Sequence, residues 1–329
     1  MIRSLTVFFC AIASLPAATP GEKFVSYEDF GAVGDGLHDD LPAIVKAHAH
    51  ANERGLPVRT RPDANYNLGK KALTAVIATD TDWNTSRFTI IDRDVEDPKA
   101  SLFEVRSLQP HKTLEITSLK RDQAQLDLSL EHDYYVTVKD DSTKRFIRQG
   151  LNANAGHPQE DSFILRSDGR IDSPIDWDYH SISEVIARPI DQETLTITGG
   201  VFNRTANNSD PADPTVYWRR NLKVLRSNTI IDGLRHHVFG EGDKGHPYAG
   251  FLYASNACNV TFQNCFVDGH KRYDKLNERG RTVAMGSYGY GARGVTNFTL
   301  RNCHMHGIMD RTRWGVIATN YCKNILVEN

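Results

Sequence analysis

Histidine and aspartate recur at one position of a segment that is repeated in the C-terminal part of the chain. The four aligned copies end, in order, at Asn203, His237, Asp268 and His306. A carboxylate beside an imidazole orients the ring and stabilises its positive charge, so such a pair can transfer protons. We expect these four side chains to form one exposed column that performs acid–base chemistry. A solvated polar ladder without chemistry is the alternative interpretation.

Charged and aromatic residues are concentrated in the loops beside this column, where 240–250 reads GEGDKGHPYAG and 268–275 reads DGHKRYDK. This mixture is typical of polysaccharide sites, because aromatic rings pack on sugars and cations pair with carboxylates or sulfates. We predict catalytic roles for His237, Asp268, His306, His270 and Lys271. We predict substrate-binding roles for Tyr248, Arg272, Arg313, Trp314, Glu241 and Asp243. For any one of these residues, an ordinary soluble turn is the alternative.

The residue pattern predicts no metal site. His304 and His306 with Asp310 would offer three zinc ligands, but two histidines on one strand face lack a fixed third ligand. No acidic cluster requires calcium. The residues by themselves therefore indicate no cofactor.

The expected column depends on a repeated strand. Its copies begin at Thr194, Asn228, Asn259, Asn297 and Asn324, which are 34, 31, 38 and 27 residues apart. Apolar residues alternate within each copy, as in a strand with one buried face, and an Asn or Gly then marks a tight turn. Irregular periods of this length are typical of stacked β-helix coils, in which equivalent residues lie about 4.8 Å apart. A sandwich would instead show a hairpin turn every 8–12 residues or so.

The same register directs two cysteines, Cys265 and Cys303, into the interior of neighbouring coils. In-register stacking is compatible with a disulfide but does not by itself give disulfide geometry. We expect a stacked pair of reduced thiols.

The N-terminal part carries the motif DFGAVGDGLHDD at 29–40, followed by a helical pattern of apolar residues from Leu41 to a stop at Gly55. This segment resembles the opening of the pectate-lyase-like family of right-handed parallel β-helices. Members often begin with a variant of DFGAxGDGxxDDxxAI, here Asp29 to Ile44. The resemblance implies an all-β, right-handed parallel β-helix (solenoid) with a short N-terminal capping helix. It also implies a lyase or glycoside hydrolase, and it allows Ca²⁺ as a cofactor because lyases of this fold often use it.

These observations predict a secreted carbohydrate-active enzyme that cleaves an acidic polysaccharide. A lyase needs a base and a cation that holds the uronate carboxylate, and His237, His270 and Lys271 suit those roles. A hydrolase needs two carboxyl groups, which the acidic residues of the same loops could supply. The signatures of the hydrolase branch do not occur in their usual form at the expected strands, which slightly favours lyase-type β-elimination. A glycoside hydrolase and a non-catalytic glycan-binding adhesin are the alternatives.

The remaining sequence suggests how the chain is organised. Residues 1–19 combine Arg3 with a short apolar stretch and small residues, which is typical of a secretory signal peptide. We expect an N-terminal cap and first coil at 20–69, and irregular early coils or an inserted β-subdomain at 70–190. Regular coils are expected at 191–329, truncated at the C-terminus. A missing C-terminal segment or another chain would then cap the last coil.

Charge and hydropathy exclude two classes of partner. The formal net charge is −2, whereas general nucleic-acid binders are usually basic. After the N-terminus, no apolar run reaches the length of about 18 residues that a membrane-spanning helix needs. We therefore expect a polysaccharide substrate, no nucleic-acid partner, no transmembrane anchor, and an extracellular or periplasmic location.

Overall fold

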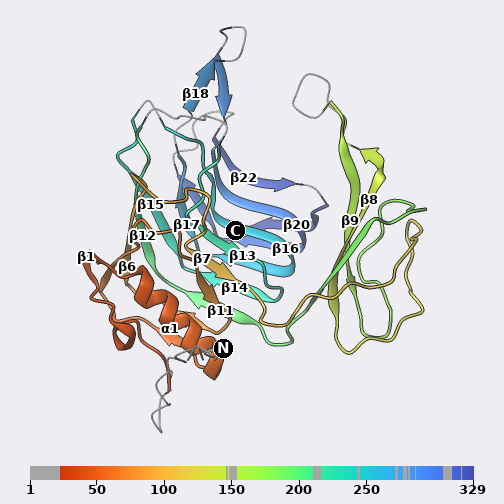
Figure 1. The fold of residues 1–329 in the computed structure, drawn as a ribbon, viewed down its shortest axis with the longest axis horizontal. Helices are drawn as coiled ribbons and strands as arrows, with labels where there is room; N and C mark the ends of the chain where they lie inside the picture. The colour runs from red at the N-terminus through yellow and green to blue at the C-terminus, as the bar shows by residue number, and fades with distance from the viewer. Residues whose placement is uncertain are drawn as a thin grey trace, which may run out of the picture.

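The computed structural model describes residues 23–145, 147, 154–209, 216–242, 245–270, 273–276, 280, 282–285, 287–306, 313–319 and 321–329. For 273–276, 282–285 and 313–319 only the backbone is described. The expected signal peptide at 1–19 lies outside these residues. Strands from successive turns of the chain pair in parallel and build a solenoid, seen from the side in Figure 1.

One wall of the solenoid is a seven-stranded sheet in which all neighbouring strands are parallel. In spatial order its strands are β1 (Asp35–Asp39), β3 (Asn65–Asn67), β6 (Arg87–Ile91), β12 (Val201–Thr205), β15 (Arg235–Phe239), β17 (Phe266–Asp268) and β21 (His304–His306). Each coil therefore contributes one short strand to this wall.

The other two walls are joined, because β16 (Ala249–Gln263) and β20 (Ser287–Arg301) run through both of them. One of these walls also contains β2 (Val58–Arg59), β5 (Thr81–Asp82), β11 (Leu195–Thr198), β14 (Thr229–Asp232) and β23 (Lys323–Glu328). The other also contains β4 (Ala75–Ile77), β7 (Phe103–Val105), β13 (Leu222–Val224) and β22 (Arg313–Thr319).

The strand register confirms the repeat that the sequence predicts. Leu195 lies opposite Thr229, Thr229 opposite Val260, Val260 opposite Phe298, and Phe298 opposite Ile325. These are the second residues of the five aligned copies. The predicted fold class, an all-β parallel β-helix with a helix at its N-terminus, is therefore confirmed.

An asparagine precedes the repeated strand in four successive coils. Asn228, Asn259, Asn297 and Asn324 all adopt the left-handed region, with φ between 52° and 57°. Asparagine tolerates this conformation because its short amide bonds locally. Here the amides bond to each other: each Nδ2 donates to Oδ1 of the asparagine in the preceding coil, at 2.8, 2.8 and 2.7 Å. The turns are thus joined by a continuous asparagine ladder.

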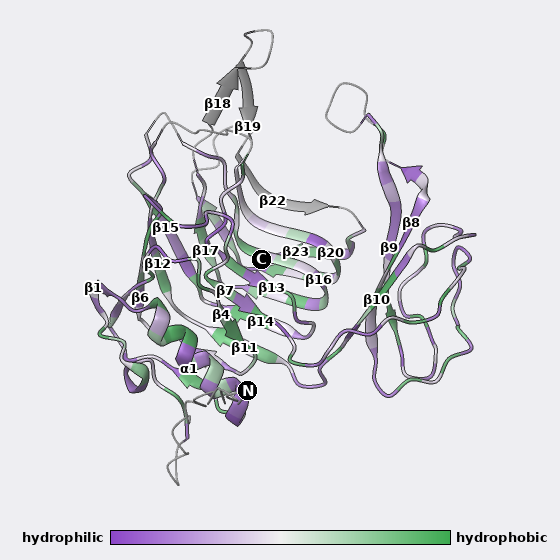
Figure 2. Ribbon diagram, viewed as in Figure 1, coloured by the Kyte–Doolittle hydropathy of each residue, from purple (hydrophilic) through white to green (hydrophobic). Residues whose placement is uncertain are grey.

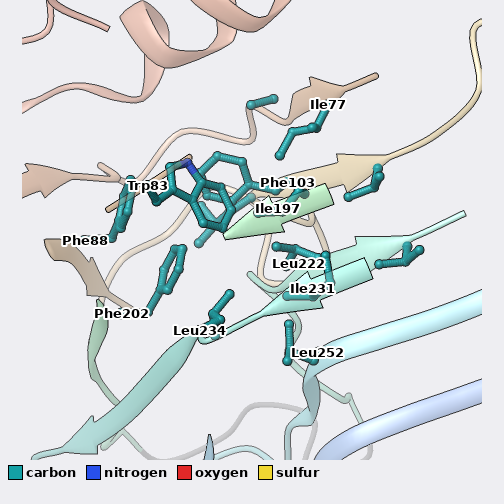
Figure 3. Close-up of a cluster of buried hydrophobic side chains, with 14 of the residues drawn as sticks. Ile77, Trp83, Phe88, Phe103, Ile197, Phe202, Leu222, Ile231, Leu234 and Leu252 are labelled. Atoms are coloured by element: carbon teal, nitrogen blue, oxygen red, sulfur yellow. The ribbon is translucent and has the colours of Figure 1, made fainter. Parts of the chain in front are cut away.

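Aromatic side chains fill the N-terminal half of the interior. Trp83, Phe88, Phe103 and Phe202 are fully buried, and the rings of Phe88 and Phe202 stack with centroids 4.5 Å apart (Figure 3). Buried aromatic rings continue into the C-terminal coils, as at Phe262. Hydrophobic and hydrophilic residues alternate along the strands in Figure 2, as one buried strand face requires.

The helix α1 (Leu41–Arg54) covers the N-terminal end of the solenoid, after a single 3-10 turn at Glu28–Phe30. Its buried face includes Leu41, Ile44 and His48, as the periodicity predicts, and its C-cap Gly55 has φ 64°. Because this face packs on the first coils, the helix prevents water from reaching the end of the core.

The last aspartate of the DFGAVGDGLHDD motif has a structural role. Asp40 is buried, and its carboxylate accepts hydrogen bonds from the backbone N–H groups of Val33 (2.7 Å) and Asn67 (3.2 Å). It therefore attaches the motif loop to β3.

Residues between β7 and β11 leave the solenoid and form a separate unit. Its three-stranded antiparallel sheet has the order β10 (Glu184–Pro189), β8 (Tyr134–Arg145) and β9 (His157–Leu165), with a hydrophobic cluster of its own. The solenoid resumes in register, since Ile197 pairs with Thr81. Residues 75–105 thus contribute strands to the solenoid, whereas most of the residues from there to β11 lie outside its walls.

The inserted sheet packs against the long strands of the solenoid (Figure 1). Tyr135 Oη donates to Gly294 O at 2.8 Å, and Tyr135 shares a buried cluster with Ile164 and Cys258. Lys323 of β23 forms an ion pair with the buried carboxylate of Asp161. A small antiparallel hairpin, β18 (Tyr273–Leu276) with β19 (Thr282–Met285), forms a separate two-stranded sheet. Within the described residues, no helix has the length and hydropathy needed to cross a membrane.

Candidate functional site

A column of polar residues runs along the outer face of the seven-stranded sheet. Strand register aligns its members, which are Asp39, Asn67, Thr89, Asn203, His237, Asp268 and His306. At about 4.8 Å per strand, the column extends for about 29 Å. The four positions that the sequence aligned are therefore neighbours on one face, at the C-terminal end of this column.

Asp268 lies between two histidines and contacts both. Its Oδ2 is 3.4 Å from His237 Nδ1, and its Oδ1 is 3.0 Å from His306 Nδ1. The backbone N–H of Val238 also donates to Asp268 Oδ2, at 3.2 Å, which holds the carboxylate in place. Since a carboxylate accepts hydrogen bonds only, the His306 Nδ1 that bonds to Asp268 carries its proton, and its Nε2 is left for chemistry. His237 Nδ1 lies within ion-pair distance of the same carboxylate.

The two histidines differ in exposure and share an aromatic neighbour. The His237 side chain is 29% exposed, whereas that of His306 is 76% exposed. The Phe266 ring lies 5.1 Å from the His237 ring and 6.1 Å from the His306 ring. On the adjacent column, Arg235 is exposed and lies opposite Phe266 in the strand register. A base, an acid, a ring and a cation therefore occupy one open patch.

Two other predicted site residues are buried instead of lining an open groove. Tyr248 is 1% exposed and His270 is 3% exposed. Their rings stack with centroids 3.6 Å apart, and His270 Nδ1 bonds to Glu241 Oε1 at 2.8 Å. Burial lowers the pKa of His270, although Glu241 opposes this effect. The structure therefore places Tyr248 and His270 in the interior and not on the open face, and their roles in binding and catalysis stay predictions.

The buried pair belongs to a larger polar network that sequence reasoning missed. Asp92 is fully buried, and its carboxylate lies 3.4 Å from Arg204 Nε, 3.2 Å from Arg220 Nε and 3.1 Å from the Tyr248 hydroxyl that donates to it. The positive charges of the two arginines are balanced by the negative charges of Asp92 and Glu241. This balance lowers the free-energy cost of burying the four groups. The only signal in the sequence was a charged residue at an inward strand position, Arg204 beside Phe202.

The remaining predicted residues cannot be assigned to either arrangement. Asp243, Lys271 and Arg272 lie outside the described residues. Arg313 and Trp314 belong to β22, opposite Ser287 and Tyr288, and their side chains are not described. By backbone position, β22 belongs to a different wall from the column.

Metal ligands do not gather in the part of the chain that the structure describes: no group of three or more His, Cys, Asp or Glu residues there is arranged to hold an ion. His304 and His306 share β21, while Asp310, the third zinc ligand considered, lies outside the described residues.

The inward cysteines are placed as the register predicts. Cys258, Cys265, Cys303 and Cys322 are free thiols, and Cys265 and Cys303 are neighbours in successive coils. A hydrogen bond from the Cys265 thiol lowers the pKa of Cys303 to about 7, while the same interaction and burial raise the pKa of Cys265. Cys265 and Cys303 are thus stacked as the register predicts, and their reduced state stays an expectation.

Comparisons with known proteins give similarity of fold only. No family model and no curated protein matches the chain. Among solved structures, the tailspike gp61 of Pseudomonas phage phi297 is 11% identical, with a TM-score of 0.37, over 94% of this chain and 65% of that one. PfbA, a surface adhesin of Streptococcus pneumoniae, is 15% identical, with a TM-score of 0.34, over 85% and 57%. The Gp54 tailspike of Acinetobacter baumannii bacteriophage AP22, solved in complex with A. baumannii capsular saccharide, is 10% identical, with a TM-score of 0.36, over 88% and 60%.

The chain thus spans less than two thirds of the length of each of these three proteins. Similarity at this level gives no basis for transferring an activity, and the assignment as a parallel β-helix rests on the strand pairing of the chain itself.

Proposed function

We propose that the chain is a secreted carbohydrate-active enzyme that binds an acidic polysaccharide along the seven-stranded sheet and cleaves it by β-elimination. The observation that carries the proposal is the contact of Asp268 with both His237 and His306 on an open face. The resemblance of Asp29–Ile44 to the pectate-lyase-like family supports it, as an expectation about the kind of substrate.

The length of the polar column suits a polymer better than a small molecule. Its side chains offer donors and acceptors over about 29 Å, which several sugar rings could occupy. Phe239 is 55% exposed at the end of β15, and it provides an apolar surface beside the column on which the face of a sugar ring can pack.

Acid–base roles follow from the single charge of Asp268. One carboxylate can stabilise one imidazolium at a time, so the proposed reaction starts from one neutral and one protonated histidine. In the proposed reaction, neutral His237 Nε2 removes the proton on C5 of a uronate, and the electron pair forms the C4–C5 double bond. The C4–O4 bond breaks, and the leaving oxygen takes a proton from His306 Nε2. At the end of this reaction His237 is protonated and His306 is neutral, which is the reverse of the starting state.

A lyase also needs a cation that stabilises the charge on the uronate carboxylate in the transition state. Arg235 lies two residues before His237 on the same strand face, about 7 Å away along the strand. Its long side chain is proposed to reach the carboxylate of the uronate whose C5 proton His237 removes. Lys271 and Arg272 remain proposed for the same role.

Hydrolysis is the less favoured chemistry for this face. A glycosidase needs two carboxyl groups about 5–9.5 Å apart. Among the described members of the column only Asp39 and Asp268 carry carboxylates, and they are separated by about 24 Å at five strand spacings. The Glu241 carboxylate is 8% exposed and bonded to His270.

The test is a panel of uronic-acid polymers, such as polygalacturonate, alginate and chondroitin sulfate, assayed with and without added Ca²⁺. We expect the ultraviolet absorbance of unsaturated uronate to rise with one of them. His237→Gln and His306→Gln should abolish the rise, while His132→Gln, an exposed histidine of the insertion, should retain it. New reducing ends without that absorbance would establish hydrolysis instead. Binding of a polymer without either product would leave the adhesin alternative.

A further inference from the structure

A cavity of about 470 Å³ lies where the inserted sheet meets the solenoid. Its walls come from three places: the segment Arg106–His111 that leaves the solenoid after β7, the end of β10 at Arg188, and the bends at Ser227 and Asn256 between two walls of the solenoid. The column with His237 belongs to a third wall, so this cavity is separate from the proposed catalytic face. Its volume falls within the range of small-molecule pockets.

The ionisable residues that line the cavity are Arg106, His111 and Arg188, and none of the other lining residues is an aspartate or a glutamate. Burial and the charge of Arg188 lower the pKa of His111, so the positive charge comes from the two arginines. Arg106 has a distant acidic neighbour, with Nη1 3.8 Å from Glu104 Oε2. A positive charge is thus left at the cavity wall.

Arg188 is the most constrained of the three. It is partly buried, and its Nη1 donates to Thr137 Oγ1 at 3.0 Å. Among the described residues, no carboxylate forms an ion pair with it. Burial lowers its pKa, yet a guanidinium stays charged at any physiological pH. A half-buried arginine without an acid leaves donors that an anion can satisfy in a bidentate way.

Asp191, three residues after Arg188 in the chain, is already occupied by other partners. Asp191 Oδ2 lies 3.2 Å from Arg226 Nε, and Asp191 Oδ1 accepts from Ser107 Oγ and Gln109 Nε2, both at 3.1 Å. Asp191 therefore fixes two lining side chains without neutralising Arg188.

The cavity lining also offers apolar surface that suits a sugar ring. It includes Leu108, which is 61% exposed, with Leu225 and two prolines. Ser227 Oγ accepts from the backbone N–H of Cys258 at 3.1 Å, so its own proton is available to donate. The cavity thus combines apolar surface, neutral donors and two guanidinium groups.

We propose that this cavity binds one carboxylate-bearing saccharide unit, with its acidic group on Arg188 and Arg106. The anionic character follows from the cavity itself, whereas the saccharide character rests on the proposed function. Such a site would hold the end or a branch of an acidic glycan at a distance from the cleavage face.

The experiment is calorimetric titration of the whole chain with galacturonate and glucuronate, compared with galactose, glucose and acetate. We expect a uronate to bind more tightly than its neutral sugar and than acetate, with an affinity that falls as salt is added. Arg188→Gln should raise the Kd about ten- to a hundredfold, as expected for losing a charge-assisted pair. Arg188→Lys should recover part of the affinity.

Arg106→Gln provides a second variant at an exposed position, for the case in which Arg188→Gln unfolds, and it should also weaken uronate binding. Equal affinity for the uronate and its neutral sugar, or affinity that neither variant changes, would overturn the proposal. Acetate binding as tightly as the uronate would show an anion site without saccharide recognition and would likewise overturn it. Polymer cleavage is measured on the same variants: cleavage without uronate binding removes the cavity proposal alone, and uronate binding without cleavage removes the proposed function alone.

Discussion

Tyr248 and His270 stack face to face, with ring centroids 3.6 Å apart and planes within 8° of each other. Tyr248 precedes β16 and His270 follows β17, so this contact joins loops from two successive coils. The Tyr248 hydroxyl also donates to Asp92 Oδ2 and accepts from the backbone N–H of Asn207, at 3.1 and 2.8 Å. One side chain therefore connects both loops to the buried ion network.

Tyr248→Phe should keep the stack and lose both hydrogen bonds. Because the change leaves two buried polar groups without this partner, we expect the free energy of unfolding to fall by about 1–3 kcal/mol. Urea unfolding followed by circular dichroism would measure it. Tyr253→Phe, at a half-buried tyrosine on β16, is the matched control and should change the free energy by less than about 0.5 kcal/mol. Equal effects of the two substitutions would contradict the assigned role of the Tyr248 hydroxyl.

His48 should make folding sensitive to acid. It is fully buried on α1, and desolvation lowers its pKa from 6.5 to about 3. Between these values the unfolded chain binds a proton that the folded chain does not. Stability is therefore complete above pH 6.5 and declines as the pH falls, by up to about 1.4 kcal/mol per pH unit for this group.

Thermal unfolding of the wild type and His48→Gln between pH 7.5 and 4.5 or so tests this linkage. The variant should lose less stability on acidification, because one buried imidazole is gone. His38→Gln, at an exposed histidine, should retain the wild-type slope. If the stability of His48→Gln falls with decreasing pH as steeply as that of the wild type, His48 is not a source of acid sensitivity.

The asparagine ladder predicts which of two substitutions at Asn297 lowers the stability of the protein more. Asn297→Gly removes the side-chain bonds to Asn259 and Asn324 but tolerates φ 57°. Asn297→Ala removes the same bonds and adds about 1–2 kcal/mol for a left-handed residue with a Cβ. Chemical unfolding should therefore rank the wild type above the glycine variant and the glycine variant above the alanine variant. A glycine variant no more stable than the alanine variant would mean that backbone strain is not what asparagine relieves there.

The thiols should differ in reactivity. Cys303 has a pKa lowered to about 7 and is partly exposed, whereas burial raises the pKa of Cys258 to about 11. Because the thiolate is the reactive form, iodoacetamide at neutral pH should modify Cys303 well before Cys258. Peptide mass spectrometry over a time course would measure the order, with Cys303→Ser as the control for peptide assignment. Faster labelling of Cys258 would contradict the assignment.

The sequence predicted the column because strand period and alternation determine it. Once Asn203, His237 and His306 occupy equivalent positions in successive copies, stacking places them together without further information. Tyr248 and His270 lie in loops between strands, where no period operates, and their burial depends on Asp92 and Arg204 from earlier coils. The repeat also gave no signal within the insertion, because an inserted sheet does not share the spacing of the coils around it.

The pairing of β5 with β11 has a consequence for biosynthesis. Thr198 Oγ1 bonds to Asp82 Oδ1 across 116 residues of chain, and most of those residues belong to the inserted unit. During translation, the edge of β5 therefore stays without its next strand until the whole insertion has left the ribosome. The entropic cost of closing a loop rises only slowly with its length, so the insertion adds little to that cost. During the delay, however, the unpaired edge of β5 can form hydrogen bonds with a strand of another chain. At this point, the order in which the ribosome delivers strands differs from the order in which the coils stack.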